Sequence, residues 1–110
     1  MVTMKKVNRQ ILRWHLKAFP DATELGQYLK FFEEVWEWVI SRGSMEELAD
    51  VYIVSAGLSE RYGVCWAGAL CRKLYNKEGL LKAVAYKMLR NVERTWTKKG
   101  RVYRHVETDR

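Results

Sequence analysis

Residues 22–62 read ATELGQYLKFFEEVWEWVI-SRGS-MEELADVYIVSAGLSERY, and this stretch decides the fold. Apolar residues recur every three or four positions on both sides of the SRGS tetrapeptide, which is the period of an α-helix. The pattern predicts one helix over residues 22–40, a turn over 41–44 and another helix over 45–62. Gly43 is placed to end the earlier helix, and Ser44 with Glu47 matches the S-x-x-E pattern of a capping box. Because the turn is short, we expect the two helices to pack antiparallel.

The same helical period continues on both sides of this pair. It predicts further helices over residues 4–18, 65–74 and 78–96. Phe19-Pro20 ends the first of these, because the residue before a proline disfavours the helical conformation. Gly63 ends the helix over residues 45–62. The chain has one proline in 110 residues and little of the apolar–polar alternation that is typical of strands, which indicates a single all-α domain over residues 1–110. Its core should span about residues 4–96, followed by a basic tail over 97–110. The weak alternation of apolar and polar residues over 101–106 predicts an extended segment within this tail.

The composition excludes several classes of protein. With 48% hydrophobic and 13% aromatic residues, the chain can bury a core and is not a disordered protein. No apolar run approaches the roughly 20 residues of a membrane span, so no membrane partner is expected. Lys5 and Lys6 precede no apolar segment of the kind found in secretory signals. Cys65 and Cys71 are too few for a disulfide framework, and two reduced thiols favour a cytoplasmic protein.

The predicted helix over 22–40 has large apolar residues on more than one of its faces. A surface helix of a small monomer needs only a single apolar face. The excess therefore predicts a homo-oligomer, a dimer or a tetramer, in which a second copy completes the helix bundle, largely through the helices over 22–40 and 45–62.

The formal net charge of +7 is unevenly distributed along the chain. Residues 1–20 carry +5, residues 21–60 carry −7 and residues 61–110 carry +9. Folding brings such blocks together, so that carboxylates lie beside cations. A site for a metal ion with a polyphosphate requires that combination, with acids for the metal and bases for the phosphates.

Four carboxylates are spaced to converge between the two central helices. Glu34 and Glu37 are three residues apart and share one helix face, as do Glu47 and Asp50. Across an antiparallel pair these faces can meet, and four carboxylates that meet do not all stay ionised without a cation. Mg²⁺ or Mn²⁺ is the oxygen-ligated ion that suits them, with two or more ions at the site. The alternative is a solvated acidic helix surface.

The predicted helix over 78–96 carries a polar face formed by Lys87, Asn91 and Arg94. Their spacings of four and three place them together. An ammonium group, an amide and a guanidinium are suited to phosphate oxygens. The alternative is again a basic surface exposed to solvent.

These residues resemble a known family. Glu34-x-x-Glu37 and Glu47-x-x-Asp50, with Glu33 before them, resemble the E-E-x-x-E…E-x-x-D signature of the MazG-like nucleotide pyrophosphohydrolases. Residues 87–96, KMLRNVERTW, are similar to the K-x-x-x-N-x-x-R segment of that family, and residues 14–27 are similar to the entry segment of its small phage and bacterial members. The nine residues between Glu37 and Glu47 are fewer than the usual spacer of the family.

The resemblance implies a four- to five-helix bundle of the all-α NTP pyrophosphatase type. It implies a hydrolase that cleaves the α–β phosphoanhydride of a nucleoside triphosphate, for example dGTP, to give a monophosphate and pyrophosphate. It also implies the cytoplasm of a bacterium or of a phage-infected host. The alternative is a basic helical protein that binds nucleic acid or serves in a structural assembly; interspersed acids make nucleic acid the less expected partner.

The resemblance also assigns roles to particular residues. Glu33 or Glu46 would orient or deprotonate the attacking water, and the choice between them stays open. Base contacts would come from Trp14, Gln27, Phe31 or Trp36. The predicted metal ligands are Glu34, Glu37, Glu47 and Asp50. The predicted catalytic carboxylates are Glu33, Glu34, Glu37 and Glu46. The predicted substrate-binding residues are Lys87, Asn91, Arg94, Trp14, Gln27 and Lys30.

Overall fold

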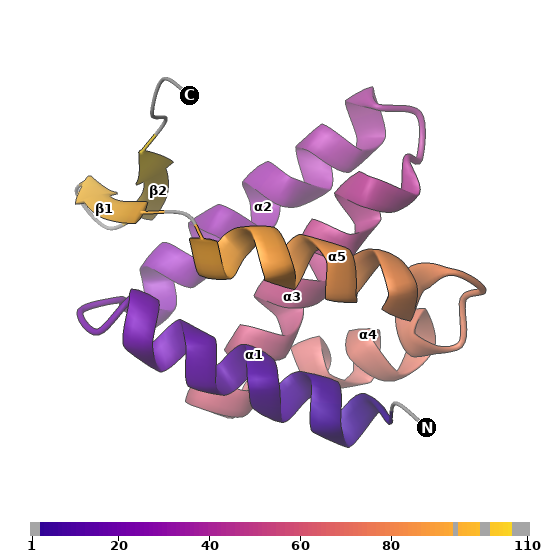
Figure 1. The fold of residues 1–110 in the computed structure, drawn as a ribbon, viewed down its shortest axis with the longest axis horizontal. Helices are drawn as coiled ribbons and strands as arrows, with labels where there is room; N and C mark the ends of the chain where they lie inside the picture. The colour runs from indigo at the N-terminus through magenta and orange to yellow at the C-terminus, as the bar shows by residue number, and fades with distance from the viewer. Residues whose placement is uncertain (1–2, 94, 100–101, 107–110) are drawn as a thin grey trace.

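The computed structural model describes residues 3–93, 95–99 and 102–106, which form five helices and a two-stranded hairpin (Figure 1). The elements are α1 (Met4–Ala18), α2 (Glu24–Ile40), α3 (Met45–Tyr62), α4 (Cys65–Tyr75), α5 (Leu80–Glu93), β1 (Thr95–Lys99) and β2 (Val102–Val106). The all-α class is confirmed, and the predicted bounds of α1 and α3 agree with the structure. No helix among the described residues is long and apolar enough to cross a membrane.

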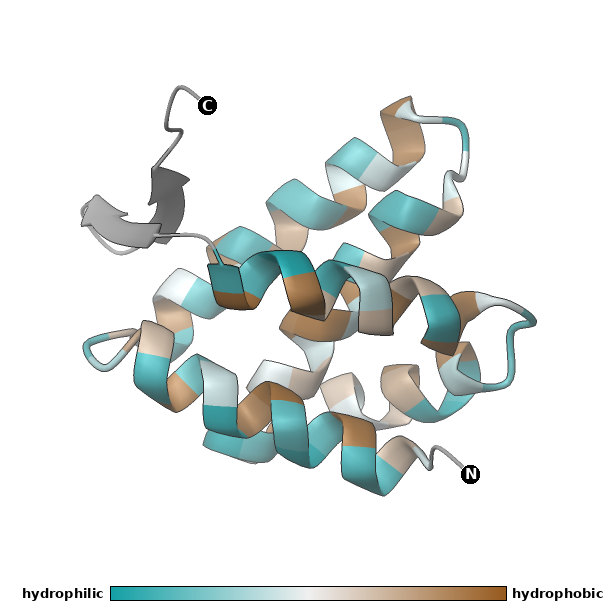
Figure 2. Cartoon of the chain, in the orientation of Figure 1, coloured by the Kyte–Doolittle hydropathy of each residue, from teal (hydrophilic) through white to brown (hydrophobic). Residues whose placement is uncertain are grey.

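The centre of the fold is α3, which packs against α1, α2, α4 and α5. From Leu48 to Leu58 every residue of α3 except Asp50 is buried. Around it, Ile11, Leu80 and Val84 from the outer helices are fully buried. Figure 2 shows hydrophobic and hydrophilic residues alternating along the outer helices at the helical period, as expected for helices with one buried face. The position of every other helix is therefore set by its contact with α3.

The helix ends follow local capping chemistry. The Thr23 hydroxyl accepts a hydrogen bond from the Gly26 amide at 3.0 Å, so α2 begins at Glu24, two residues later than predicted. Gly63, with φ of 67°, takes the left-handed conformation that ends α3, as predicted. The turn from α2 to α3 lies where the sequence predicted it, with positive φ at Arg42 and Gly43.

The capping box predicted for Ser44 and Glu47 is not formed. The Ser44 side chain makes no capping hydrogen bond, and its backbone amide donates to the Ser41 hydroxyl at 3.2 Å instead. The Ser41 hydroxyl in turn donates to the Trp38 carbonyl at 2.8 Å. The turn is thus closed by the serine at its beginning, and the Glu47 carboxylate lies with those of α2.

The last helix is shorter than predicted. It ends at Glu93, and the chain continues as an antiparallel hairpin in which Trp96 pairs with His105. Threonine, tryptophan, valine and tyrosine in these strands favour extended structure, which explains the early end of α5. The weak alternation over 101–106 is confirmed as strand over the described part, and β2 lies beside α2.

The outer side of α2 is exposed among the described residues. Phe32 and Trp36 are 65% and 64% exposed, and Leu25, Leu29 and Val39 are also exposed. These five residues, here called the outer α2 face, are spaced by four and three, which is the heptad spacing of a helix that packs on another helix. The predicted share of α3 in an oligomer interface stays a prediction, and its residues from Leu48 to Leu58, apart from Asp50, are already buried within one chain. Neither Cys65 nor Cys71 forms a disulfide, as predicted.

A buried hydrogen bond joins α1 to α3 and gives the first test of the fold. The Tyr52 hydroxyl donates to Asn8 Oδ1 at 2.7 Å. We expect Tyr52→Phe to destabilise the protein by about 1–3 kcal/mol, because the Asn8 oxygen is left buried without its donor. Urea unfolding measures the change. Tyr86→Phe is the control, since the Tyr86 side chain is exposed, and an equal loss in both variants would contradict the assignment.

Candidate metal centre

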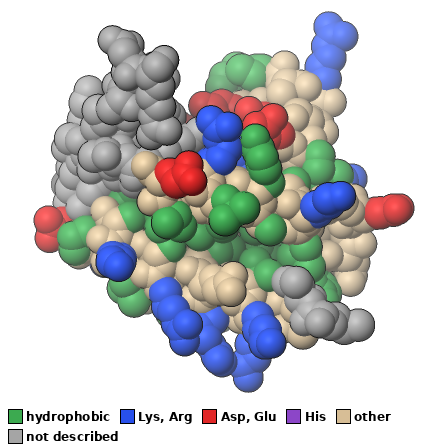
Figure 3. Space-filling model, in the orientation of Figure 1, with side chains coloured by type: hydrophobic (Ala, Val, Ile, Leu, Met, Phe, Trp, Pro, Cys, Tyr) green, Lys and Arg blue, Asp and Glu red, His purple; other side chains and the backbone are tan. Residues whose placement is uncertain are grey.

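Three carboxylates converge where the end of α2 meets the beginning of α3. Glu34, Glu37 and Glu47 each offer an oxygen atom, and the three atoms lie within 4.8 Å of one another. Glu34 is buried, Glu47 is half-buried and Glu37 is exposed, so the group runs from the protein interior to the solvent. Figure 3 shows acidic side chains gathered in one patch with basic side chains beside them. The structure thus brings together three of the four predicted metal ligands.

Glu34 is the member that most requires a cation. Its Oε1 lies 3.1 Å from Lys30 Nζ, while its Oε2 is buried and has no hydrogen-bond partner among the described residues. Burial raises the pKa of Glu34 to about 7, opposed by Lys30 and reinforced by Asp50 and Glu37. A buried carboxylate oxygen without a partner is costly, and a hard divalent ion between Glu34, Glu37 and Glu47 would satisfy it. The donor set, all oxygen and all acidic, therefore fits Mg²⁺ or Mn²⁺.

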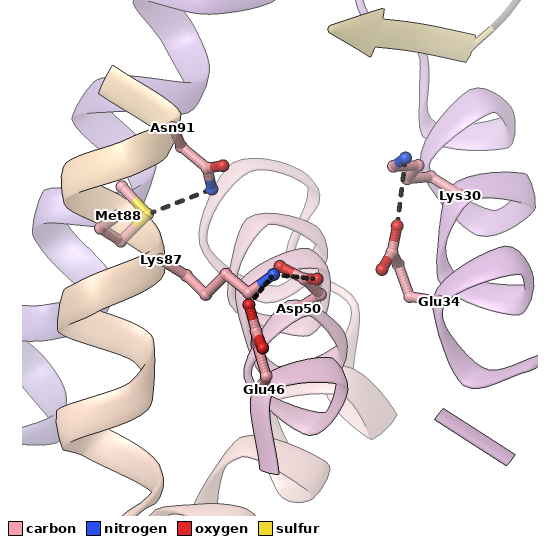
Figure 4. A network of polar contacts seen from close by, with 7 residues as sticks. All are labelled: Lys30, Glu34, Glu46, Asp50, Lys87, Met88 and Asn91. Atoms are coloured by element: carbon pink, nitrogen blue, oxygen red, sulfur yellow. Dashed lines mark hydrogen bonds and ion pairs between the residues drawn. The ribbon is translucent and has the colours of Figure 1, made fainter. Parts of the chain in front are cut away.

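Asp50, the fourth predicted ligand, is held by a lysine from another helix. Lys87 Nζ on α5 lies 3.1 Å from Asp50 Oδ2 and 3.4 Å from Glu46 Oε1 (Figure 4). Burial opposes the charge on Lys87, but the two carboxylates outweigh it and raise the pKa of Lys87. The pKa of Glu47 is raised, first by burial and then by the nearby charge of Asp50. Asp50 therefore still lies close to the three-carboxylate group. Asp50 is thus at the edge of the group, paired with an internal cation.

The structure places three of the other residues that were predicted for this side of the site. Asn91 is buried on α5, one turn beyond Lys87, with Nδ2 at 4.0 Å from the Met88 sulfur. Glu33 is half-buried and Glu46 is exposed. Arg94 lies outside the described residues, so its predicted role stays a prediction. Sequence reasoning placed Lys30 and Lys87 as substrate contacts and missed that both pair with the acids, although the i,i+4 spacing of Lys30 and Glu34 is a known pairing distance.

Trp14 and Gln27 lie in a second cluster, at the junction of α1, α2 and α3. His15 is 2% exposed, and burial lowers its pKa to about 4, so the ring is neutral. Arg61 donates to His15 Nδ1 at 2.9 Å and to the Phe19 carbonyl at 2.7 Å, which fixes the connection from α1 to α2. His15 is thus a packing residue.

The position of this cluster separates it from the carboxylates. The Trp14 ring packs edge-on against Phe19 at 5.0 Å, and Gln27 is 4% exposed. Gln27 precedes Glu34 by seven residues, which is about 10 Å along a helix. The predicted contacts of Trp14 and Gln27 with substrate therefore stay predictions. Phe31 packs edge-on against Trp66 at 4.9 Å, and Trp36 is exposed.

Comparison with known proteins addresses the fold. The sequence matches no protein-family model and no curated protein. Among solved structures it is similar to the cyanophage S-2L MazG-like pyrophosphohydrolase bound to dGDP and three catalytic Mn²⁺ ions per active site. The identity is 24%, the match covers 97% of this chain and 100% of that one, and the TM-score is 0.52. The fold is that of a MazG-like pyrophosphohydrolase. The bundle implied by the resemblance in the sequence is thereby confirmed.

The raised pKa of the buried Glu34 makes the free energy of unfolding of the metal-free protein depend on pH. Its folded pKa of about 7 lies above the ordinary value of 4.5, so the folded state disfavours its ionised form. The free energy of unfolding should therefore fall as pH rises from 4.5 to 7, and the full penalty of about 3 kcal/mol applies above pH 7. Glu34→Gln should remove this fall and stabilise the metal-free protein at pH 8, but not at pH 4.

Urea unfolding at the two pH values measures the effect. Glu93→Gln, on the exposed surface of α5, is the matched control, because it removes a carboxylate outside the three-carboxylate group. If the two variants have the same pH dependence as the unsubstituted protein, the burial of an ionisable Glu34 is wrong.

Proposed function

We propose that this protein is a metal-dependent nucleoside triphosphate pyrophosphohydrolase, which converts a (d)NTP to the (d)NMP and pyrophosphate. The observation that carries the proposal is the buried Oε2 of Glu34, which has no hydrogen-bond partner in the described part of the chain and lies in a group with the carboxylates of Glu37 and Glu47. The likeness of fold to a MazG-like pyrophosphohydrolase supports the same activity.

The metal ligands in this proposal are Glu34, Glu37, Glu47 and Asp50, with two or more Mg²⁺ or Mn²⁺ ions. Such ions neutralise charge on phosphate oxygens and lower the pKa of a coordinated water. The similar structure contains three Mn²⁺ ions per active site, which supports more than one ion here. The gradient from buried Glu34 to exposed Glu37 leaves one side of the group open to a substrate.

The protein groups divide the rest of the work. Lys87, with Asn91 one turn beyond it, binds phosphate oxygens and stabilises the leaving pyrophosphate. Water attacks the α-phosphorus, the bond from this phosphorus to the bridging oxygen breaks, and the water proton passes to a carboxylate and then to solvent. Glu33 and Glu46 are the candidate bases, and Glu33→Gln and Glu46→Gln assayed separately would distinguish them.

The substrate is tested with a panel of eight nucleoside and deoxynucleoside triphosphates, each with Mg²⁺ and with Mn²⁺. dGTP is the first candidate, because the similar structure is bound to dGDP. Formation of monophosphate and pyrophosphate supports the proposal, whereas formation of diphosphate and phosphate would contradict the cleavage site.

The alternative, a nucleic-acid-binding protein, is favoured by Lys5, Arg9 and Arg13, which are exposed on α1 among other cations and no acids. If no triphosphate in the panel is hydrolysed, the hydrolase proposal is contradicted and nucleic-acid binding by this surface of α1 becomes the favoured function.

The carboxylates make a direct prediction for activity. We expect Glu37→Gln and Asp50→Asn each to lower kcat/KM by about a hundredfold or more, because each removes a charged metal ligand and about 3 kcal/mol of transition-state stabilisation. Glu37→Gln should not lose stability without metal, since it relieves repulsion among acids, whereas Asp50→Asn should lose some, because Lys87 keeps its charge without the Asp50 carboxylate. Glu60→Gln, exposed at the far end of α3, is the control and should keep full activity. Full activity of both site variants would contradict the proposed ligand set.

We also propose that a second copy of the chain covers the outer α2 face. Exposed apolar residues at heptad spacing are what a helix needs to pack against the same helix of another copy. Light scattering at micromolar concentration should give the mass of a dimer or a tetramer. Combining Phe32→Glu with Trp36→Glu should give the mass of one chain. Leu89→Glu, at an equally exposed position on α5, is the control and should leave the assembly intact.

A further inference from the structure

Two lysines lie inside the acidic site rather than around it. Lys87 reaches Asp50 and Glu46 from α5, and Lys30 reaches Glu34 from α2. The Lys87 side chain is only 10% exposed, and that of Lys30 is 22% exposed. Their ammonium groups are thus positioned by packing, unlike those of lysines on an open surface, and they neutralise part of the negative charge of the site.

Lys87 contacts the one predicted ligand that does not join the three-carboxylate group. Asp50 Oδ2 is 3.1 Å from Lys87 Nζ, which is the distance of a charged hydrogen bond. An ammonium group and a divalent ion at the same carboxylate repel each other strongly, because little water separates them at a partly buried position. Asp50 therefore cannot be fully bound by both.

We propose that Lys87 is a competing internal cation, which holds Asp50 and Glu46 when no metal is bound and yields Asp50 to the metal site when metal is bound. The inference rests on the proposed function, because it assumes that the carboxylates bind divalent ions. It assigns Lys87 a positioning role in addition to its proposed contact with phosphate.

The exchange links the two ligands of the site. When Lys87 leaves Asp50, its ammonium group becomes available to the phosphate chain, and its partly buried position makes a new anionic partner favourable. Metal binding should then strengthen nucleotide binding, and nucleotide binding should strengthen metal binding by the same factor. Lys87 thus opposes the entry of metal alone and favours the entry of metal together with an anionic substrate.

The experiment replaces Lys87 by methionine, which keeps the length and the apolar stem without the charge. Calorimetric titration with Mn²⁺ in the absence of nucleotide should show about tenfold tighter metal binding in Lys87→Met than in the unsubstituted protein. A purely structural lysine would give equal or weaker metal binding after its removal. Lys82→Met, on the exposed side of the same helix, is the matched control and should bind Mn²⁺ as the unsubstituted protein does.

A second measurement distinguishes competition from damage to the fold. Without metal, Lys87→Met should melt at a lower temperature, because Asp50 and Glu46 lose their cation; with saturating Mn²⁺ the difference should disappear or reverse. Lys87→Gln, which keeps a hydrogen-bond donor, should show the same direction if the methionine variant does not fold. In an Asp50→Asn background, the gain in Mn²⁺ affinity from Lys87→Met should fall below about threefold.

The outcomes separate the inference from the function on which it rests. Equal or weaker Mn²⁺ binding by both Lys87 variants, with Mn²⁺-dependent hydrolysis intact in the unsubstituted protein, would overturn the inference alone. A gain that is unchanged in the Asp50→Asn background would overturn it as well. No Mn²⁺ binding by any of the variants or by the unsubstituted protein would overturn both the inference and the proposed metal site.

Discussion

Repulsion between carboxylates at the junction of α2 and α3 is the constraint on which the rest of the site depends. Glu34, Glu37 and Glu47 present oxygens within 4.8 Å of one another, with Asp50 next to them. Such a group is unfavourable unless cations neutralise it. Within the described residues, Lys30 from α2 and Lys87 from α5 supply part of that neutralisation. The site thus joins three helices through charge, where the core joins them through apolar contact.

The central position of α3 makes this arrangement possible. Its middle, from Val51 to Leu58, is buried on all sides with only Ser55 and the Tyr52 hydroxyl as polar side-chain groups, so the other helices pack around it. The charged residues of α3 lie in its first two turns and in its last turn. Glu46 and Glu47 occupy the first turn, where the helix dipole favours negative charge and partly offsets the repulsion. The turn closed by Ser41 then brings the end of α2 back to this first turn. The fold therefore determines which carboxylates meet, and the helix dipole lowers the cost of their meeting.

Local patterns explain how much of this was predictable from the sequence. The bounds of α1 and α3 follow from Pro20 and Gly63, whose effects depend only on their neighbours. The pairing of Glu34 with Glu37 follows from helical spacing. The contact of Lys87 with Asp50 joins residues far apart in the chain, and nothing in either segment specifies it. The Ser44 capping box failed for a related reason, because two serines compete for one turn and the pattern does not say which will close it.

The two faces of α2 connect the site to the assembly. Only Gly26, Gln27 and Glu34 of this helix are buried, so α2 is fixed to the rest of the chain by fewer buried side chains than α3. Yet α2 supplies Glu34 and Glu37, and its position relative to α3 sets the distance between these carboxylates and Glu47. Repulsion across the site pushes α2 away from α3, while burial of the outer α2 face against a second copy would hold α2 at a fixed position. A partner on that face would therefore stabilise the carboxylate group without contacting it, and metal binding and assembly should strengthen each other.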